Sequence, residues 1–308
     1  MISKAFQVFW VLFGATLIVT GMLRLVPGDP VDHILGEQAT QQARMQLSRD
    51  LGLTDAHGVR VGYLRQYGNF IQKIATNELT SYRTREPVMS IIAGRLPYTG
   101  VLALASMLFA ICLGPILGVM AAWKRGRLLD QFLRLVALLG ISVPRFFFAP
   151  LLLLAFSIYW SIFPISGATD GLLSLVLPAL SLGFAMAAVQ MRFTRASILE
   201  VMSTDYIRTA RAKGLSERVV YFKHALRNAL MPVITVIGME LGSLLAGAVV
   251  VEKIFSWPGI GLLLLESIQQ LDMPMVQGVV LVIAFFYVVT NLVTDWVYGL
   301  IDPRVRVS

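Results

Sequence analysis

Long apolar stretches with few or no charged residues alternate with shorter charged segments along the chain. A helix needs about 20 mostly apolar residues to cross a bilayer. The pattern therefore predicts six transmembrane helices: Ala5–Leu23, Leu96–Trp123, Leu135 to about Phe163, Gly171–Met191, Asn228–Val251 and Met273–Thr294. Pro144 and Arg145 interrupt the third stretch, so an alternative is a short entry segment followed by a span from Phe146. The fold class expected is an all-α membrane protein.

The first apolar stretch could instead be a secretory signal peptide, because Lys4 precedes its apolar core. No small-residue cleavage pattern follows the core, and Arg24 comes directly after its last residues. We therefore expect an uncleaved helix, with residues 1–26 as the first transmembrane segment.

Composition agrees with a membrane location. Of 308 residues, 56% are hydrophobic and only 14% are charged, whereas soluble domains carry about 25% charged residues. The formal net charge of +8 could suggest nucleic-acid binding, but so apolar a chain makes a bilayer the better partner. The single cysteine, Cys112, excludes an internal disulfide, and the three widely separated histidines predict no metal site.

The charges between the predicted spans indicate an orientation. Lys124–Arg134 carries four basic residues and one acidic residue, and Arg192–Arg227 carries eight basic residues and three acidic residues. The positive-inside rule places both connections, and with six spans both termini, on the cytoplasmic side. We thus expect an extracytoplasmic segment at 27–94, a membrane core at 95–302 that holds the other five spans and a cytoplasmic loop at 192–230, and a cytoplasmic tail at 303–308.

The extracytoplasmic segment is polar and electrically balanced, with seven basic and seven acidic residues between Pro27 and Gly94. Its apolar pattern predicts helices at Ala39–Leu51 and Val61–Ile74, with Gly52 ending the first. Such a segment could cap the outer mouth of the membrane core, or it could dock a partner.

The loop from Ser203 to Pro232 predicts a helix, a glycine turn and a second helix. Ser203, Thr204 and Asp205 are all good N-cap residues, and Gly214 suits the left-handed position that ends a helix. Ser216 can cap the helix that follows. This element could lie on anionic lipid as an interfacial amphipathic helix, or it could be a short, stiff docking helix for a cytoplasmic partner.

The same loop resembles the EAA-type loop of ABC importer permeases, in the version of the dipeptide, oligopeptide and nickel permease family. The wider pattern has Glu-Ala-Ala and a glycine after three further residues. Those positions are Arg208, Thr209, Ala210 and Gly214 here, and a later proline of the general motif is Arg227. Both departures resemble the peptide and nickel branch.

Further motifs of that family occur in order along essentially the whole chain. They are Pro27-Gly28-Asp29-Pro30, Leu51-Gly52-Leu53, Ser81-Tyr82-Arg83, Arg95-Leu96-Pro97, Gly140-Ile141-Ser142-Val143-Pro144, Pro164-Ile165-Ser166-Gly167, the run from Val251 to Gly261, and Asp302-Pro303-Arg304.

The resemblance implies the first of two membrane subunits in an ATP-driven importer of the cell inner membrane. It implies four kinds of partner: a second, similar permease, two cytoplasmic ATPases, an extracytoplasmic substrate-binding protein and the lipid bilayer. ATP and Mg would be bound by the ATPases, and this chain would hold no cofactor. The chain agrees in having no G-x-x-x-x-G-K-[ST] phosphate-binding loop.

Carried over by position, the resemblance implies that the segment from Asp205 to Leu215 couples the chain to the ATPase. Tyr206 and Ile207 would supply apolar packing, Arg208 and Arg211 would contact the ATPase surface or lipid, and Gly214 would make the turn. The full set expected to take part is Asp205, Tyr206, Ile207, Arg208, Thr209, Ala210, Arg211, Gly214 and Leu215.

Two charged residues, Arg145 and Glu240, interrupt otherwise apolar spans. A charge at mid-bilayer costs about 2.5–3.5 kcal/mol on insertion scales, so each is expected to face the helix bundle or a watery cavity. The two could form an ion pair that fixes the packing of the third and fifth spans, or they could line the pathway. Arg145 could also extend toward the inner headgroups.

Three functions compete on the sequence alone. An importer permease is favoured, with alternating access as its mechanism and no bond chemistry of its own. An ion-coupled secondary transporter is weaker because the six spans show no evident internal repeat. An intramembrane enzyme is weaker still, since no H-E-x-x-H motif and no paired acids fall within the spans. Peptides are the first choice of substrate, and nickel or a metal chelate is the alternative.

Overall fold

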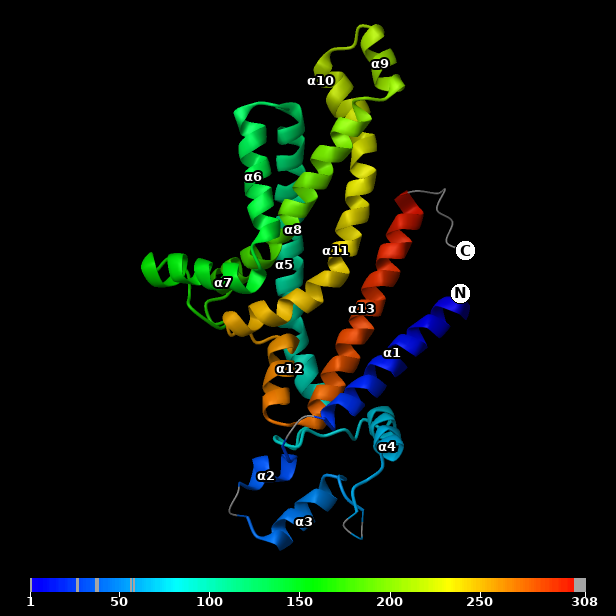
Figure 1. Ribbon diagram of the computed structural model, residues 1–308, viewed down its shortest axis with the longest axis vertical. Coiled ribbons are helices and arrows are strands. Elements are labelled where there is room, and N and C mark those ends of the chain that lie inside the picture. Colours follow the sequence, from blue (N-terminus) through cyan, green and yellow to red (C-terminus); the bar gives the residue numbers. More distant parts are fainter. Residues whose placement is uncertain (1, 26–27, 37–38, 56, 58, 302–308) are drawn as a thin grey trace. The chain divides into compact units, whose positions relative to one another are not determined.

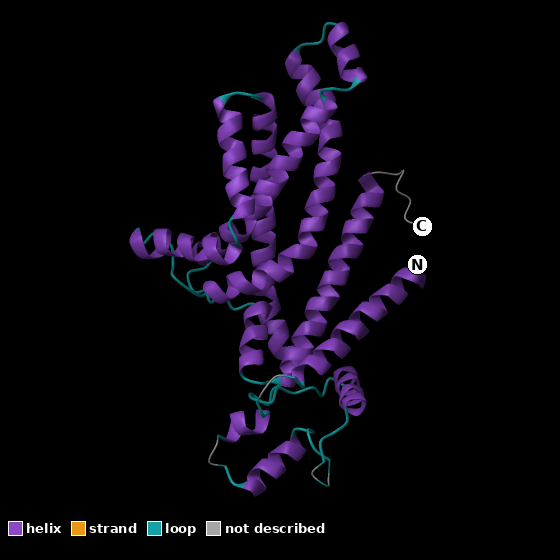
Figure 2. Cartoon of the chain, viewed as in Figure 1, coloured by secondary structure: helices purple, strands orange, loops and turns teal. Residues whose placement is uncertain are grey.

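The computed structural model describes residues 2–25, 28–36, 39–55, 57 and 59–301. The secondary structure of these residues consists of helices and two isolated β-bridges, and no strand occurs among them (Figure 2). The predicted tail at 303–308, the Asp302-Pro303-Arg304 motif and Pro27 lie outside the described residues. The chain divides into two compact units, Met1–Thr99 with Pro258–Val288 and Gly100–Trp257 with Val289–Ser308.

The first unit holds the N-terminal helix, the polar segment after it and one short apolar helix near the C-terminal end (Figure 1). Its helices are α1 (Ile2–Leu23), α2 (Pro30–Leu35), α3 (Gln41–Asp50), α4 (Tyr63–Ala75) and α12 (Ile260–Gln269). Two long helices, α5 (Val88–Trp123) and α13 (Met273–Ile301), begin in the first unit and end in the second.

An aromatic and aliphatic core holds the first unit together. Tyr67 and Phe70 on α4 pack with Val88 and Ile92 on α5 and with Met275 on α13. The Tyr67 hydroxyl lies 3.0 Å from the hydroxyl of Thr16 on α1, and Tyr63 donates a hydrogen bond to the Leu17 carbonyl. The predicted helices at Ala39–Leu51 and Val61–Ile74 are thus confirmed as α3 and α4, and α4 packs on the N-terminal span.

A buried carboxylate fixes the segment that precedes α5. Asp272, just before α13, accepts hydrogen bonds from the Ser81 hydroxyl and from the backbone N–H of Tyr82 at 3.1 Å. The Tyr82 hydroxyl donates in turn to the Leu51 carbonyl at 3.2 Å. The Ser81-Tyr82-Arg83 motif is therefore bound to Asp272, which lies about 190 positions later in the chain.

The second unit contains the remaining helices and the cytoplasmic loop predicted from the sequence. They are α6 (Leu128–Ser142), α7 (Arg145–Leu153), η1 (Leu154–Tyr159), α8 (Leu172–Val201), α9 (Asp205–Ala212), α10 (Glu217–Val219), η2 (Val220–Ala225) and α11 (Leu226–Ile254). The two π-helical turns, η1 and η2, continue their neighbouring helices. The chain is therefore helical without a break from Glu217 to Ile254.

Small residues let α5 approach α8 closely within the second unit. A side-chain carbon added at Gly118 would lie 2.6 Å from the Cβ of Thr194, and one added at Gly114 would lie 2.8 Å from the Ala187 carbonyl oxygen. Glycines that face a neighbouring helix at four-residue spacing allow such backbone approach. The main core of the unit then forms around Leu182 and Met186 of α8 and Leu244 of α11.

Five helices in the described residues are long and apolar enough to cross a membrane. The third predicted span differs: α6 and α7 meet at a bend of 107°, and they add a sixth span only if the bent pair crosses as one. Val143 and Pro144 form this break, because proline disfavours a helical conformation in the residue before it. The sequence allows two interpretations of the third stretch: one span, or a short entry segment followed by a span from Phe146. The second interpretation agrees with the structure, in which α6 is the segment before the break.

Candidate functional site

The predicted coupling segment forms a short helix, α9, bounded as the sequence suggested. Thr204 is its N-cap residue, with an extended backbone, although its hydroxyl donates to the Val201 carbonyl at 2.6 Å instead of capping α9. Gly214 has φ +77°, which confirms the predicted left-handed position after the helix. Ser216 then precedes α10. The helix, turn and helix are thus set by local residue chemistry.

The two faces of α9 have different surroundings. Ile207 and Ala210 are buried and pack against Val220 and Ala225 of the helix that follows. Tyr206 is 43% exposed, and the side chains of Asp205 and Arg208 are 93% and 78% exposed. Ile207 therefore anchors α9 to its own chain, and the surface open to a partner is the opposite face.

Polar contacts fasten the ends of α9 to the helix that leads into α11. Arg211 pairs with Glu217 across the Gly214 turn, with its Nε 2.8 Å from Oε1. Asn228 donates a hydrogen bond to the Tyr206 hydroxyl at 2.8 Å. These contacts and the buried face hold α9 against one continuous helix. A force on α9 would therefore reach α11 directly.

A buried ion pair that the sequence analysis missed supports the base of this loop. Asp130 on α6 is paired with Arg195 on α8, and it also accepts a hydrogen bond from the Gly126 backbone N–H at 2.9 Å. Its side chain is 1% exposed. The spacing of Asp130 and Arg195 along the chain does not indicate that they pair. The one available sign is that Asp130 is the single acidic residue among four basic residues in the Lys124–Arg134 connection.

The two intramembrane charges have different nearest neighbours. Glu240 on α11 accepts a hydrogen bond from the Gln190 side-chain amide at 2.7 Å. Arg145, at the start of α7, reaches the space that a side chain at Gly247 would occupy. In the part of the chain that the structure describes, no direct ion pair joins Arg145 to Glu240. A role for both residues in packing or in the pathway stays a prediction.

Gln190 adds a polar side chain to this region that the sequence analysis did not single out. It is fully buried on α8, and its Oε1, like the Thr194 hydroxyl one turn later, has no hydrogen-bond partner in the described residues. Buried polar atoms without partners are rare in folded proteins. Gln190 and Thr194 thus lie one turn apart on α8, and Gln190 links α8 to Glu240 of α11, a helix that packs against it.

With this geometry in view, comparison with known proteins identifies the class. Residues 114–307 match the family described as binding-protein-dependent transport system inner membrane component. The chain belongs to this family, and it is a multi-pass membrane protein of a transport system.

Several relatives match over nearly the whole chain. The dipeptide transport system permease protein DppB of Alkalihalophilus pseudofirmus is 39% identical, over 96% of this chain and 96% of that protein. The di/tripeptide transport system permease protein DppB of Pseudomonas aeruginosa is 41% identical, over 96% of this chain and 94% of its own. The glutathione transport system permease protein GsiC of Escherichia coli O6:H1 is 40% identical, over 96% of this chain and 94% of its own.

A solved structure shares the fold. A chain of the MetNI methionine ABC transporter, in an inward-facing conformation, superposes with a TM-score of 0.59 and 16% identity. The match covers 70% of this chain and 99% of that chain. The all-α membrane fold expected from the sequence is therefore confirmed, and it is shared with a chain of an ABC importer.

Proposed function

We propose that this chain is a permease subunit of an ATP-driven importer and forms half of a translocation pathway for peptides. One observation carries the proposal: α9 presents an exposed face to solvent while its buried face and its polar contacts attach it to the helix from Glu217 to Ile254. A stiff helix held in this way transmits rigid-body motion, whereas a flexible loop would absorb it.

The partners follow from the transport class. A second, homologous permease would complete the pathway, an extracytoplasmic protein would deliver substrate, and two cytoplasmic ATPases would bind the loop 192–230. ATP and Mg would be held by the ATPases. The loop and both termini would face the cytoplasm, because Arg192–Arg227 carries eight basic residues against three acidic ones.

Alternating access would use the contacts around α9. Closure of the two ATPases on ATP would move the α9 helices of both permeases, and each α9 would displace its own α11 through Ile207 and the Arg211–Glu217 pair. Opening of the pathway toward the binding protein would follow, and ATP hydrolysis would reset it. The chain itself would make and break no covalent bond.

Peptides are the proposed substrate because the relatives that match over the full length are described as dipeptide, di/tripeptide and glutathione permeases. In the pathway, Glu240 and Arg145 would meet the ammonium and carboxylate ends of a peptide. Nickel or a metal chelate is the alternative substrate. Uptake assays that compare a labelled dipeptide with nickel in the same cells separate the two.

Co-purification of the ATPases tests the proposal. The wild-type chain is expected to bring down ATPase subunits. Tyr206→Ala is expected to reduce their yield, because it removes an exposed aromatic side chain of α9 together with the hydroxyl that accepts a hydrogen bond from Asn228. Tyr159→Ala is the matched control, since Tyr159 is an exposed tyrosine outside the loop. Peptide uptake that persists in vesicles without any ATPase would contradict the proposal.

A further inference from the structure

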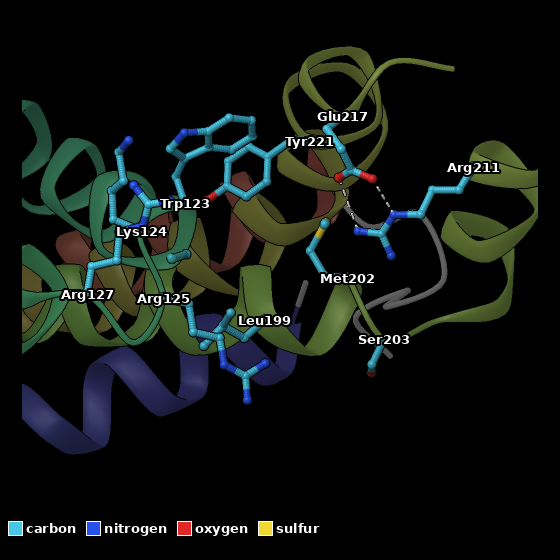
Figure 3. Close-up of a pocket in the computed structure, with 11 residues that line it drawn as sticks. Trp123, Lys124, Arg125, Arg127, Leu199, Met202, Ser203, Arg211, Glu217 and Tyr221 are labelled. Atoms are coloured by element: carbon cyan, nitrogen blue, oxygen red, sulfur yellow. Dashed lines mark hydrogen bonds and ion pairs between the residues drawn. The ribbon is translucent and has the colours of Figure 1, made fainter. Parts of the chain in front are cut away.

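A cavity of about 510 Å³ lies beside α9, where three membrane-spanning helices end. Helix α5 ends at Trp123, α8 ends at Val201, and the continuous helix that leads into α11 begins at Glu217. The cavity lies between the turn at 124–127 and the Arg211–Glu217 pair, with Met202 and Tyr221 between them (Figure 3). Trp123 is also the last residue of the apolar stretch Leu96–Trp123, so this end of the cavity lies near the depth of the lipid headgroups.

The cavity carries an excess of positive charge. Four cationic side chains line it, Lys124, Arg125, Arg127 and Arg211, against the single acidic Glu217. Glu217 does not balance the other three, because both of its oxygens are engaged by Arg211, at 2.8 and 3.3 Å.

Asp130, which accepts a hydrogen bond from the backbone N–H of Gly126 in the same turn, does not neutralise the three cations either. Asp130 accepts two hydrogen bonds from Arg195 and does not line the cavity. Among the residues that the structure describes, Lys124, Arg125 and Arg127 therefore share one cavity without forming an ion pair.

Apolar and aromatic side chains frame the same cavity. The Trp123 ring lies 4.7 Å from the ring of Tyr221 and 5.6 Å from that of Phe222. Phe222 is exposed, as are Leu128 and Phe132 on the first turns of α6. Tryptophan and tyrosine concentrate at membrane–water interfaces, where one side of the ring meets hydrocarbon. A ligand that fits this place combines a negative charge with hydrocarbon.

We propose that this cavity binds a phosphate group, and that an anionic phospholipid headgroup supplies it. Basic pockets between helices on the cytoplasmic side bind such headgroups. An acidic segment of the ATPase is the less suitable occupant, because Asp205, Tyr206 and Arg208, which are exposed on α9, do not line the cavity. The assignment of this face to the cytoplasm rests on the proposed function. A bound headgroup would join the 124–127 turn to the Arg211–Glu217 pair and so support α9.

The test measures lipid retained by the purified full-length chain, alone and with its ATPases. The chain is exchanged into nanodiscs of phosphatidylcholine with phosphatidylglycerol, washed with detergent, and the retained lipid is quantified by mass spectrometry. The variant Lys124→Gln/Arg125→Gln/Arg127→Gln removes the cationic turn. Arg218→Gln/Lys223→Gln/Arg227→Gln is the matched control, because it removes the same charge from exposed positions that do not line the cavity.

Wild type and control are expected to retain phosphatidylglycerol, and the turn variant is expected to lose it by roughly tenfold or more. The charge-retaining variant Lys124→Arg/Arg125→Lys/Arg127→Lys should keep the lipid, which separates loss of the site from loss of the fold. The assay requires neither substrate nor ATP. Failure of the lipid proposal is therefore distinct from failure of the importer proposal, which the co-purification test reports.

Three results would overturn the proposal. Equal loss of lipid from the turn variant and the control would indicate general surface charge. Inorganic phosphate that binds the chain as well in phosphatidylcholine alone, and displaces the lipid, would indicate a site for the free ion. Unchanged lipid retention with reduced ATPase yield in the turn variant would assign the cavity to a protein partner.

Discussion

Arg195 donates two hydrogen bonds to Asp130, from Nε to Oδ1 at 2.7 Å and from Nη2 to Oδ2 at 2.9 Å, although the two residues are 65 positions apart. The pair joins the first turn of α6 to the end of α8, two turns before the loop that carries α9. Because Asp130 is almost completely buried, its charge depends on this partner for compensation. This ion pair therefore fixes the end of α8 against α6 next to the segment that carries α9.

Arg195→Ala is expected to lower the free energy of unfolding by about 3 kcal/mol, because it leaves a buried carboxylate without its main counter-charge. Arg134→Ala is the matched control. Arg134 also lies near Asp130, at 3.5 Å, but half of its side chain is exposed, so its loss should cost less than about 1 kcal/mol. Unfolding by sodium dodecyl sulfate in mixed micelles measures both values, and equal losses would contradict the assignment.

Gly214→Ala is expected to weaken association with the ATPases because alanine strains the left-handed backbone of the turn that follows α9. Gly214 has φ +77°, and an added Cβ would meet nothing within 4 Å, so the substitution introduces conformational strain of about 1 kcal/mol without a clash. Gly214→Asn is the control, because asparagine adopts left-handed conformations more readily. Pull-down of the ATPases should rank wild type first, asparagine next and alanine last. If alanine binds as well as glycine, the turn does not position α9.

The sequence predicted those parts of the fold that depend on local composition. The spans can be found from the length of each apolar stretch, because a helix must be about 20 apolar residues long to cross the bilayer. The turn can be found from Gly214, because few residues other than glycine adopt its left-handed backbone conformation. The extension of α8 beyond Met191 to Val201 was missed, since polar residues such as Arg192 continue a helix without any apolar signal. The break after Ser142 was foreseen as an alternative because proline has a local effect.

The contacts between helices could not be predicted in the same way. Asp130 with Arg195, and Gln190 with Glu240, are pairs brought together by the packing of α6, α8 and α11, and nothing in their spacing along the chain indicates it. The basic turn at 124–127 was predicted only as a sign of orientation. Its place in a cavity with Arg211 required the three-dimensional arrangement.

Glu240→Gln is expected to preserve the fold and reduce peptide uptake by about tenfold, if the carboxylate meets the ammonium group of the substrate. An amide has nearly the same shape as the carboxylate, so packing against Gln190 should change little. Glu200→Gln removes one negative charge from an exposed position at the end of α8 and serves as the control. Uptake in proteoliposomes and folding yield are measured together. Normal uptake with a low yield would favour a packing role instead.

Deprotonation of Tyr82 is expected to lower the stability of the first unit at alkaline pH. Burial, and next the nearby carboxylate of Asp272, raise the pKa of the Tyr82 hydroxyl above its ordinary value of 10.0. The folded chain then holds this proton more tightly than the unfolded chain, so the contribution to stability is full below pH 10 and falls as the pH rises above it. Tyr82→Phe should flatten this fall in thermal unfolding at alkaline pH, and a profile unchanged from wild type would contradict the assignment.

Gly118→Ala is expected to separate α5 from α8. The new Cβ would lie 2.6 Å from the Cβ of Thr194 and 2.7 Å from the Met191 carbonyl oxygen, and the second of these is backbone that cannot rotate away. Overpacking of this kind costs about 1–3 kcal/mol. Gly100→Ala on the same helix is the control, because an added carbon there meets nothing within 4 Å and alanine favours the helix. Thermal unfolding in detergent should therefore give a lower midpoint for Gly118→Ala and an equal or higher midpoint for Gly100→Ala. Two variants that unfold alike would show that α5 and α8 are not held in close contact at Gly118.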